Sequence, residues 1–350
     1  MKRILYKQSK QIVYVVRLVI AVVVVIVGYQ LYNYFHANFY TPDHETAYLY
    51  IRPGDNFTDV VNQLQKKHMV KNIHSFIDAA TLIGYDKHVR SGRYAITDGM
   101  DNQKLLYHLD KRIQAPVHLT FNNLRTKEEL AGRLAKQLML DSLTIIQQLN
   151  NAEYDKHYGF TPETIVALFI PNTYEILWDV SMVQLMKRMD HEYKLFWTPE
   201  RLSKAKAENL SPADVVTLAS IVEEETNRAQ DKPIIAGLYL NRLHRGMPLQ
   251  SCPTVKFALQ NFALERITGK DLEVKSPYNT YHHEGLPPGP IRLPSIESVD
   301  AVLNYSPNNY LYMCAKETLN GEHYFATTWA EQKKNAARYA AALNQRGIFQ

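Results

Sequence analysis

The longest uninterrupted hydrophobic stretch lies near the start of the chain, between Leu18 and Phe35. Val, Ile, Leu and aromatic side chains dominate these eighteen residues, and none of them is charged. As a helix they would span about 27 Å, close to the hydrocarbon thickness of a bilayer. The pattern therefore predicts a single transmembrane helix over 18–35. A cleaved signal peptide is the alternative, but the stretch is long and no small-residue cleavage site follows it.

Short alternating and helical patterns come next. They predict strands at 47–51, 92–96 and 117–121, and helices at 57–67, 73–82 and 102–109. Their order predicts a small α+β module over residues 45–121. Its opening, Ile51–Phe57, places an Arg-Pro-Gly-Asp turn before an amphipathic helix and resembles a LysM-like glycan-binding module. A structural spacer is the alternative interpretation of the same residues.

The remainder of the chain predicts a second α+β domain, over residues 122–350. Strand patterns occupy 310–314 and 323–325, and helical patterns occupy 126–138, 141–150, 183–195, 234–243, 301–303 and 329–344. Residues 150–158 are polar and predict a loop. A proline among the apolar residues of 169–175 predicts a buried turn rather than a helix there.

One more helix begins at Pro212 and runs directly into three carboxylates. Ser211 followed by proline is a helix start signal, because serine caps the helix and proline fits its first position. The apolar side chains of this helix share one face and predict its burial. At about 100° per residue, Glu224 points away from that face into solvent, while Glu223 and Glu225 lie at its two edges.

A carboxyl group at the edge of a buried face is partly desolvated. Desolvation raises its pKa, so that it can hold a proton near neutral pH, which is what a general acid requires. Glu223 and Glu225 are therefore both candidate acids, whereas Glu224 is not. A solvated run of charge at a helix end is the alternative.

The net charge of +5 is concentrated at the start of the chain. Five basic residues precede Leu18 and no acidic residue occurs before Asp43, so the rest of the chain is formally neutral. A nucleic-acid-binding domain would itself carry the basic excess, so we expect no nucleic-acid partner. Basic residues before an apolar helix stay in the cytoplasm, which predicts a cytoplasmic tail over 1–17 and an external domain from residue 40 onward.

Other reactive side chains do not form a recognisable catalytic pattern. Cys252 and Cys314 make no disulfide framework, and the sequence leaves open whether they pair. Ser220 lies mid-helix without the turn motif of a serine nucleophile. The histidines and glutamate at His282, His283, Glu284 and His323 lack zinc-ligand spacing. We therefore expect neither a metal nor a cofactor.

Three loops after the Glu-rich helix share an unusual composition. Residues 241–254, 276–281 and 285–291 are rich in Gly, Pro, Asn and Tyr. Flat aromatic faces suit sugar rings, and neutral amides and hydroxyls suit sugar hydroxyl and N-acetyl groups. The loops thus predict a carbohydrate cleft, with ordinary turns as the alternative.

The Glu-rich helix and these loops together resemble the YceG-like (MltG-type) endolytic murein transglycosylases. The matching segments occur in the family's order and cover the chain from the apolar stretch to the last helix; they are 171–175, 219–226, 241–243, 249–255, 278–281, 285–291 and 323–325. Cys252 departs from the family, which usually has Asp at this position, so no role is assigned to it.

The resemblance implies a lytic transglycosylase, a carbon–oxygen lyase that acts on polysaccharide. Such an enzyme cleaves between N-acetylmuramic acid and N-acetylglucosamine and closes a 1,6-anhydro ring. The resemblance implies Glu223 as the catalytic acid and base, with Glu225 in support. The glycan would be held by side chains from the polar loops and the strand at 323–325, namely Asn241, Gln250, Tyr278, Asn279, Thr280, Tyr281 and His323.

The same resemblance implies where the protein acts. Its substrate would be peptidoglycan strands on the outer (periplasmic) side of the bacterial cytoplasmic (inner) membrane. Cleavage of nascent strands would end their elongation, with peptidoglycan synthases as protein partners. A tether of a few nanometres would raise the local concentration of the catalytic domain at wall close to the bilayer.

Two other functions fit the sequence. A wall hydrolase would use water and a second carboxylate such as Asp271, Glu273 or Glu284. A non-catalytic anchor would bind glycan and recruit synthases. The chemical end left on the product separates the first from a transglycosylase, and replacing Glu223 separates the second.

Overall fold

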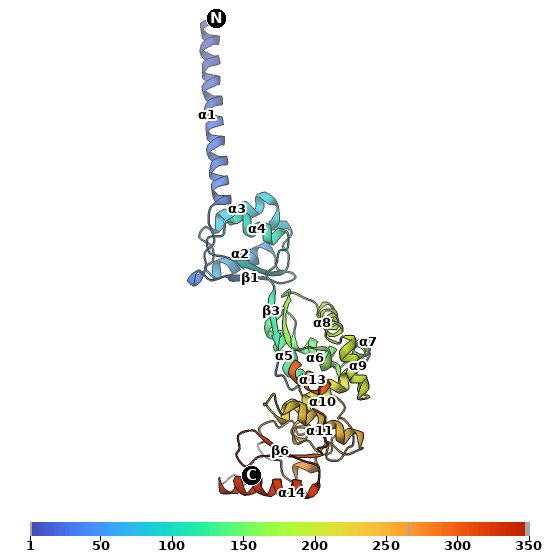
Figure 1. Cartoon of the computed structure of the whole chain (residues 1–350). Helices are drawn as coiled ribbons and strands as arrows, with labels where there is room; N and C mark the ends of the chain where they lie inside the picture. The colour runs from blue at the N-terminus through green and yellow to red at the C-terminus, as the bar shows by residue number, and fades with distance from the viewer. Residues whose placement is uncertain (1, 265–266, 347–350) are drawn as a thin grey trace. The chain divides into compact units, whose positions relative to one another are not determined.

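The computed structural model describes residues 2–264 and 267–346. It combines helices with three small two-stranded sheets, which confirms the predicted α+β class. The chain forms two compact units (Figure 1). One comprises Met1–Val117 with Glu175–Asp179, and the other His118–Tyr174 with Val180–Gln350.

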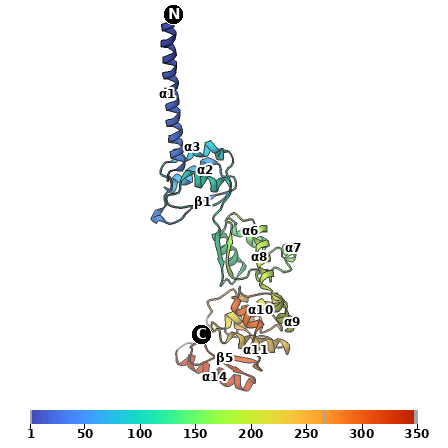
Figure 2. The same ribbon diagram turned by 45° about the horizontal axis from the view of Figure 1, so that its top comes forward.

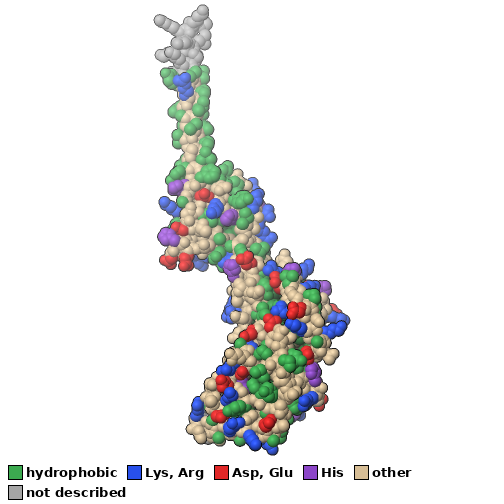
Figure 3. Space-filling view, viewed as in Figure 1, with side chains coloured by type: hydrophobic (Ala, Val, Ile, Leu, Met, Phe, Trp, Pro, Cys, Tyr) green, Lys and Arg blue, Asp and Glu red, His purple; other side chains and the backbone are tan. Residues whose placement is uncertain are grey.

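The first unit begins with α1, Lys2–Phe35. Its segment Ile12–Phe35 has a mean hydropathy of 2.7 and lies outside the core, long and apolar enough to cross a membrane. Figure 3 shows apolar side chains along this segment. Asn102 donates its side-chain amide to the carbonyl of Asn33 at 2.7 Å, and Tyr34 packs on the apolar core, so the last turn of α1 belongs to the folded unit.

The rest of the first unit follows the predicted order. β1, Ala47–Ile51, pairs antiparallel with β2, Gly92–Ile96, and the helices are α2, Phe57–Lys66, α3, Ile73–Ile83, and α4, Asn102–Asp110. Two short 3₁₀ helices, Pro42–His44 and Tyr85–Lys87, connect them. Phe76, Tyr85 and Tyr94 are fully buried between the sheet and the helices.

The second unit surrounds α10, Pro212–Glu225, with other helices. α10 packs against α11, Lys232–His244, α12, Cys252–Ala258, and α13, Ile296–Leu303; Figures 1 and 2 both place α10 beside α11. Most residues of β3, Val117–Phe121, and of β4, Asn172–Ile176, also belong to this unit. Its remaining elements are α5, Lys127–Gln137, α6, Ser142–Gln148, α7, Ala152–His157, a 3₁₀ turn, Ile165–Leu168, α8, Met182–Phe196, α9, Pro199–Ala207, a 3₁₀ turn, Asp271–Glu273, β5, Tyr312–Ala315, β6, His323–Ala326, and α14, Trp329–Gln345. β3 pairs with β4, and β5 pairs antiparallel with β6.

Several predicted elements are wrong in kind or extent. The loop predicted at 150–158 is largely the helix α7, which Asn151 caps through its side chain. The turn predicted at 169–175 leads into β4. α9 and α12 were not predicted, and α13 begins at Ile296, five residues before the predicted start at 301.

Asp155 on α7 is a cost to this fold at neutral pH. It is fully buried, and neither carboxylate oxygen has a hydrogen-bond partner among the described residues. Burial raises its pKa to about 6, although the charge of Lys127 opposes the shift. Because the folded state holds the proton more tightly than the unfolded state, stability falls as the pH rises from about 4 to about 6.

We therefore expect Asp155→Asn to stabilise the protein at pH 8 and to leave it nearly unchanged at pH 4. The rise in pKa from 3.8 to about 6 corresponds to about 3 kcal/mol at most. Denaturant unfolding of the full chain in detergent at both pH values measures the effect. Glu153→Gln, an exposed change on the same helix, is the control, and an equal gain from it would contradict this account.

Candidate active site

The site is built on the C-terminal end of α10. Ser211 and Asp214 form a reciprocal capping box at its start, with Pro212 in the first turn. Every residue from Val215 to Val222 is buried, so the helix is enclosed on all sides rather than along one stripe. The enclosed helix holds its three terminal glutamates against fixed neighbours.

Glu223 is held as a carboxylate. Ser295, the N-cap of α13, donates to Oε2 from its backbone N–H at 2.7 Å and from its hydroxyl at 2.6 Å. Burial acts to raise the pKa of Glu223, but hydrogen bonds from Ser295 and Ser298 and the charge of Arg292 outweigh it and lower the pKa. The sequence-based expectation of a raised pKa is therefore wrong for Glu223.

The prediction that Glu224 points into solvent is wrong. Arg125 donates to its two oxygens at 3.1 and 3.3 Å, and Arg292 donates to Oε1 at 2.5 Å. Arg292 is itself buried and also contacts Glu223, with 3.7 Å between Nη2 and Oε1. Glu224 does lie on the face of α10 opposite the apolar side chains, but Arg125 and Arg292, which are distant in sequence, cover that face.

Glu225 occupies a different environment. Tyr239 and Ser251 each donate a hydroxyl hydrogen bond to its Oε1 at 2.6 Å. Burial raises its pKa, more strongly than these two hydrogen bonds and the charge of His323 lower it. Among the described residues both hydrogen bonds end on Oε1, which leaves Oε2 as the oxygen that can carry a transferable proton.

Buried polar contacts fix the position of Ser251. The hydroxyl of Thr280 accepts the backbone N–H of Ser251 at 3.0 Å, and the hydroxyl of Thr254 donates to the Ser251 carbonyl at 2.7 Å. Arg242 donates to the carbonyls of Pro248 and Leu249, both at 2.8 Å. These contacts hold the loop before α12 at several points and keep Ser251 within hydrogen-bond distance of Glu225.

Three of the predicted glycan-binding residues hold the protein's own backbone. Asn279 is fully buried and donates to two carbonyls of its loop at 2.8 and 2.9 Å. Thr280 is buried against Ser251. Asn241 donates to the carbonyls of Asn308 and Tyr310 at 2.9 and 3.0 Å. The polar groups of Asn279 and Thr280 and the amide nitrogen of Asn241 thus hold loops together, and a role of these residues in glycan contact stays a prediction.

The other four predicted residues keep accessible surface. Gln250 is exposed, has a positive φ of 55°, and accepts hydrogen bonds from Arg242 through its side-chain oxygen. Tyr278 is half-buried, with its ring 4.8 Å from that of Phe257. Tyr281 is half-buried and contacts Cys252, and His323 lies 3.3 Å from Asp231. These four remain candidates for glycan contact.

The structure also shows the roles of Ser220 and Ser251 and the state of the two cysteines. Ser220 is buried, donates to the Thr217 carbonyl and accepts the N–H of Ile291, so it joins α10 to the loop at 285–291. Cys252 and Cys314 are free thiols. Ser251 was missed as a functional residue, although it lies inside the matched segment 249–255.

Proteins with similar sequences carry the name endolytic murein transglycosylase. An endolytic murein transglycosylase of Bacillus subtilis (strain 168) is 29% identical over 320 residues, covering 86% of this chain and 87% of that protein. One of Streptococcus pneumoniae (strain ATCC BAA-255 / R6) is 26% identical over 328 residues, and the match spans 83% of this chain but 57% of that protein.

A solved structure is also similar. A putative yceG-like protein from Listeria monocytogenes matches with a TM-score of 0.53 and 28% sequence identity, covering 83% of this chain and 99% of that one. The sequence model of the YceG-like family matches residues 49–338, which is most of the chain. With its fold, its Glu-bearing helix and this match taken together, the chain belongs to the YceG-like family.

Proposed function

We propose that this protein is a membrane-anchored endolytic lytic transglycosylase of peptidoglycan, with Glu225 as its acid and base. The observation that carries the proposal is the environment of Glu225, a carboxyl group with a raised pKa that the described residues fix through one oxygen only. The relatives named endolytic murein transglycosylases support the substrate class.

One carboxyl group is sufficient for this chemistry. Protonated Glu225 gives its proton to the glycosidic oxygen as the bond to the muramic C1 breaks. The resulting carboxylate then takes the proton of the muramic C6 hydroxyl, whose oxygen bonds to C1 and closes the 1,6-anhydro ring. Glu225 thus regains the proton that it gave, and no water is consumed.

The hydrolase alternative needs a second carboxylate, and the structure favours none. Asp271 accepts the backbone N–H and hydroxyl of Thr268 at 2.8 and 2.7 Å, which is a turn-capping role. Glu273 and Glu284 are exposed. The resemblance of the sequence to the family implied Glu223 as the acid, but we assign Glu223 to anchoring α13, since Ser295 and Arg292 hold its carboxylate ionised.

The location follows from α1. Its apolar segment serves as the anchor, and the basic residues before Leu18 keep the N-terminus in the cytoplasm. The catalytic unit then faces the outer side of the cytoplasmic membrane, where nascent strands emerge and synthases would be its partners. Cleavage there terminates elongation, and the LysM-like module would hold the glycan or act as a spacer.

Mass spectrometry of peptidoglycan digested by the full chain in detergent tests the proposal. Anhydro-ended fragments, each lighter by one water than a reducing-end fragment, are the expected products. Reducing ends would establish a hydrolase. Glycan binding without cleavage by the folded protein would establish the anchor alternative.

Tyr239→Phe tests how Oε1 is held. Burial raises the pKa of Glu225, and the Tyr239 hydrogen bond is among the contacts that lower it. Without that bond the pKa rises further, so the alkaline limb of the kcat profile should move to higher pH. We expect kcat at the optimum to fall less than about 100-fold. A limb that moves to lower pH would contradict the assignment of Glu225 as the acid.

A further inference from the structure

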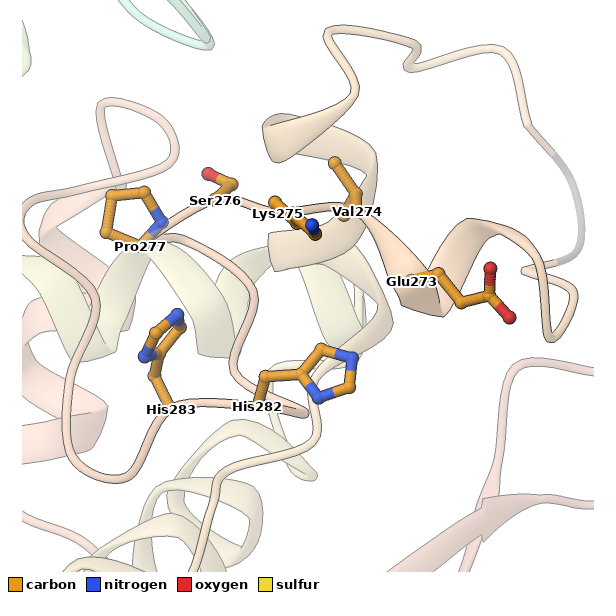
Figure 4. Close-up of a pocket in the computed structure, with 7 residues that line it drawn as sticks. All are labelled: Glu273, Val274, Lys275, Ser276, Pro277, His282 and His283. Carbon is orange, nitrogen blue, oxygen red and sulfur yellow. The ribbon is translucent and has the colours of Figure 1, made fainter.

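A pocket lies in the second unit, beside the segments that hold the catalytic loop (Figure 4). Its volume is ≈ 620 Å³, within the range of small-ligand sites. One wall is the segment 273–277, and the facing wall is His282 and His283. None of these side chains takes part in the proposed chemistry at Glu225.

The protein's own hydrogen bonds shape this pocket. Asn279 donates to the carbonyls of Leu272 and Val274, and the backbone N–H of Asn279 donates to the Ser276 carbonyl at 2.9 Å. The His282 ring lies 2.7 Å from the Leu272 carbonyl. The two walls are therefore tied together without a ligand, which lowers the ordering cost of binding one.

The lining combines groups that can bind a carboxylate with apolar surface. Lys275 and His283 supply nitrogen donors, whereas the His282 ring already contacts the Leu272 carbonyl. Val274 and Pro277 supply apolar contacts. Figure 4 shows the carboxylate of Glu273 at the far end of the pocket from His283. This chemistry fits an acidic peptide with small side chains better than it fits a neutral sugar.

The pocket is close to Glu225 along the chain. Thr280 binds Ser251, which binds Glu225, and Tyr281 contacts Cys252. His283 lies three residues after Thr280, so their backbones are at most about 11 Å apart. A group attached to the sugar at the cleavage site could reach such a pocket.

We propose that this pocket binds the peptide stem carried by muramic acid. Lys275 and His283 take a stem carboxylate, and Val274 and Pro277 contact its small side chains. The inference rests on the proposed function, because it presumes a peptidoglycan substrate. It makes the enzyme selective for strands that still carry their stems.

The test compares two substrates. Glycan strands with stems, and the same strands after an amidase has removed the stems, are digested by the full chain in detergent. For Lys275→Gln/His283→Gln we expect KM on stem-bearing strands to rise about tenfold with kcat unchanged, because uniform binding is lost. Cleavage of stem-free strands should not change. Lys270→Gln, an exposed change in the same loop but outside the pocket, is the matched control.

An equal loss on both substrates, or no loss on either, overturns the inference. A titration of the free stem peptide, followed by NMR, decides it independently of catalysis. Binding to the parent chain that weakens about tenfold in the double variant supports the pocket. No binding, or equal binding by both, overturns it. If the parent chain cleaves neither substrate, the proposed function fails while the titration still judges the pocket.

Discussion

Glu225→Gln is expected to abolish strand cleavage, with kcat falling about 10²–10⁴-fold, the range that a general acid and base contributes. Glutamine matches glutamate in shape, and its amide oxygen can still accept the hydroxyls of Tyr239 and Ser251. What it lacks is a transferable proton. The release of anhydro-ended fragments over time at saturating substrate measures the loss, and unchanged thermal unfolding shows that the variant is folded.

Glu223→Gln is the matched comparison on the same helix. Ser295 can still donate to an amide oxygen, so α13 should stay in place. We expect activity to remain within about tenfold of the parent, because no proton is transferred through this group. The opposite result, with Glu223→Gln inactive and Glu225→Gln active, would return the catalytic role to Glu223 as the family resemblance implied.

The fold of the first unit could be predicted well because its signals are local. Asn56, Asn72 and Asp101 each cap the helix that follows them, so the starts of α2, α3 and α4 are written in a few adjacent residues. β1 and β2 alternate with a period of two. Such patterns need no knowledge of what packs against them.

The second unit was harder because some of its short helices have little apolar periodicity. α7 has six residues and a polar surface, and its only fully buried side chain is Asp155. α12 begins with Cys252-Pro253 inside a stretch that reads as a loop. α9 does carry a start signal, Thr198 before Pro199. α7 and α12 are held by contacts with the rest of the unit rather than by the helix propensity of their own residues.

In the candidate site, too, local features could be predicted and contacts between distant segments could not. The sequence placed three glutamates at the end of a buried helix, and the structure confirms that placement. The choice between them depends on residues far along the chain: Ser251 is 26 residues from Glu225, and Arg292 is 68 residues from Glu224. A helical wheel gives the direction of a side chain but not the partner it meets, so the pKa of Glu223 could not be predicted.

Arg292→Met is expected to destabilise the second unit by about 3–5 kcal/mol at pH 7.5, the usual result of removing one partner from a buried ion cluster. The Arg292 side chain is only 9% exposed, and it neutralises Glu223 and Glu224, which are 17% and 16% exposed. Without it, two neighbouring carboxylates remain half-buried, and Arg125 is their one ion-pair partner among the described residues. Denaturant unfolding of the full chain in detergent measures the change.

The pH dependence separates lost charge from lost packing. Burial acts to raise the pKa of Glu223, but Ser295, Ser298 and Arg292 together depress it. The stability that this pairing contributes is therefore present above the usual glutamate pKa and is lost as the pH falls through the depressed value. The gap between Arg292→Met and the parent should therefore narrow in acid. The Arg125 side chain is 37% exposed and, within the described part of the chain, forms an ion pair with Glu224 alone. Arg125→Met should therefore cost no more than about 1 kcal/mol. Equal losses from the two arginines, or a gap that does not narrow in acid, would mean that Arg292 acts by filling space rather than by neutralising the glutamates.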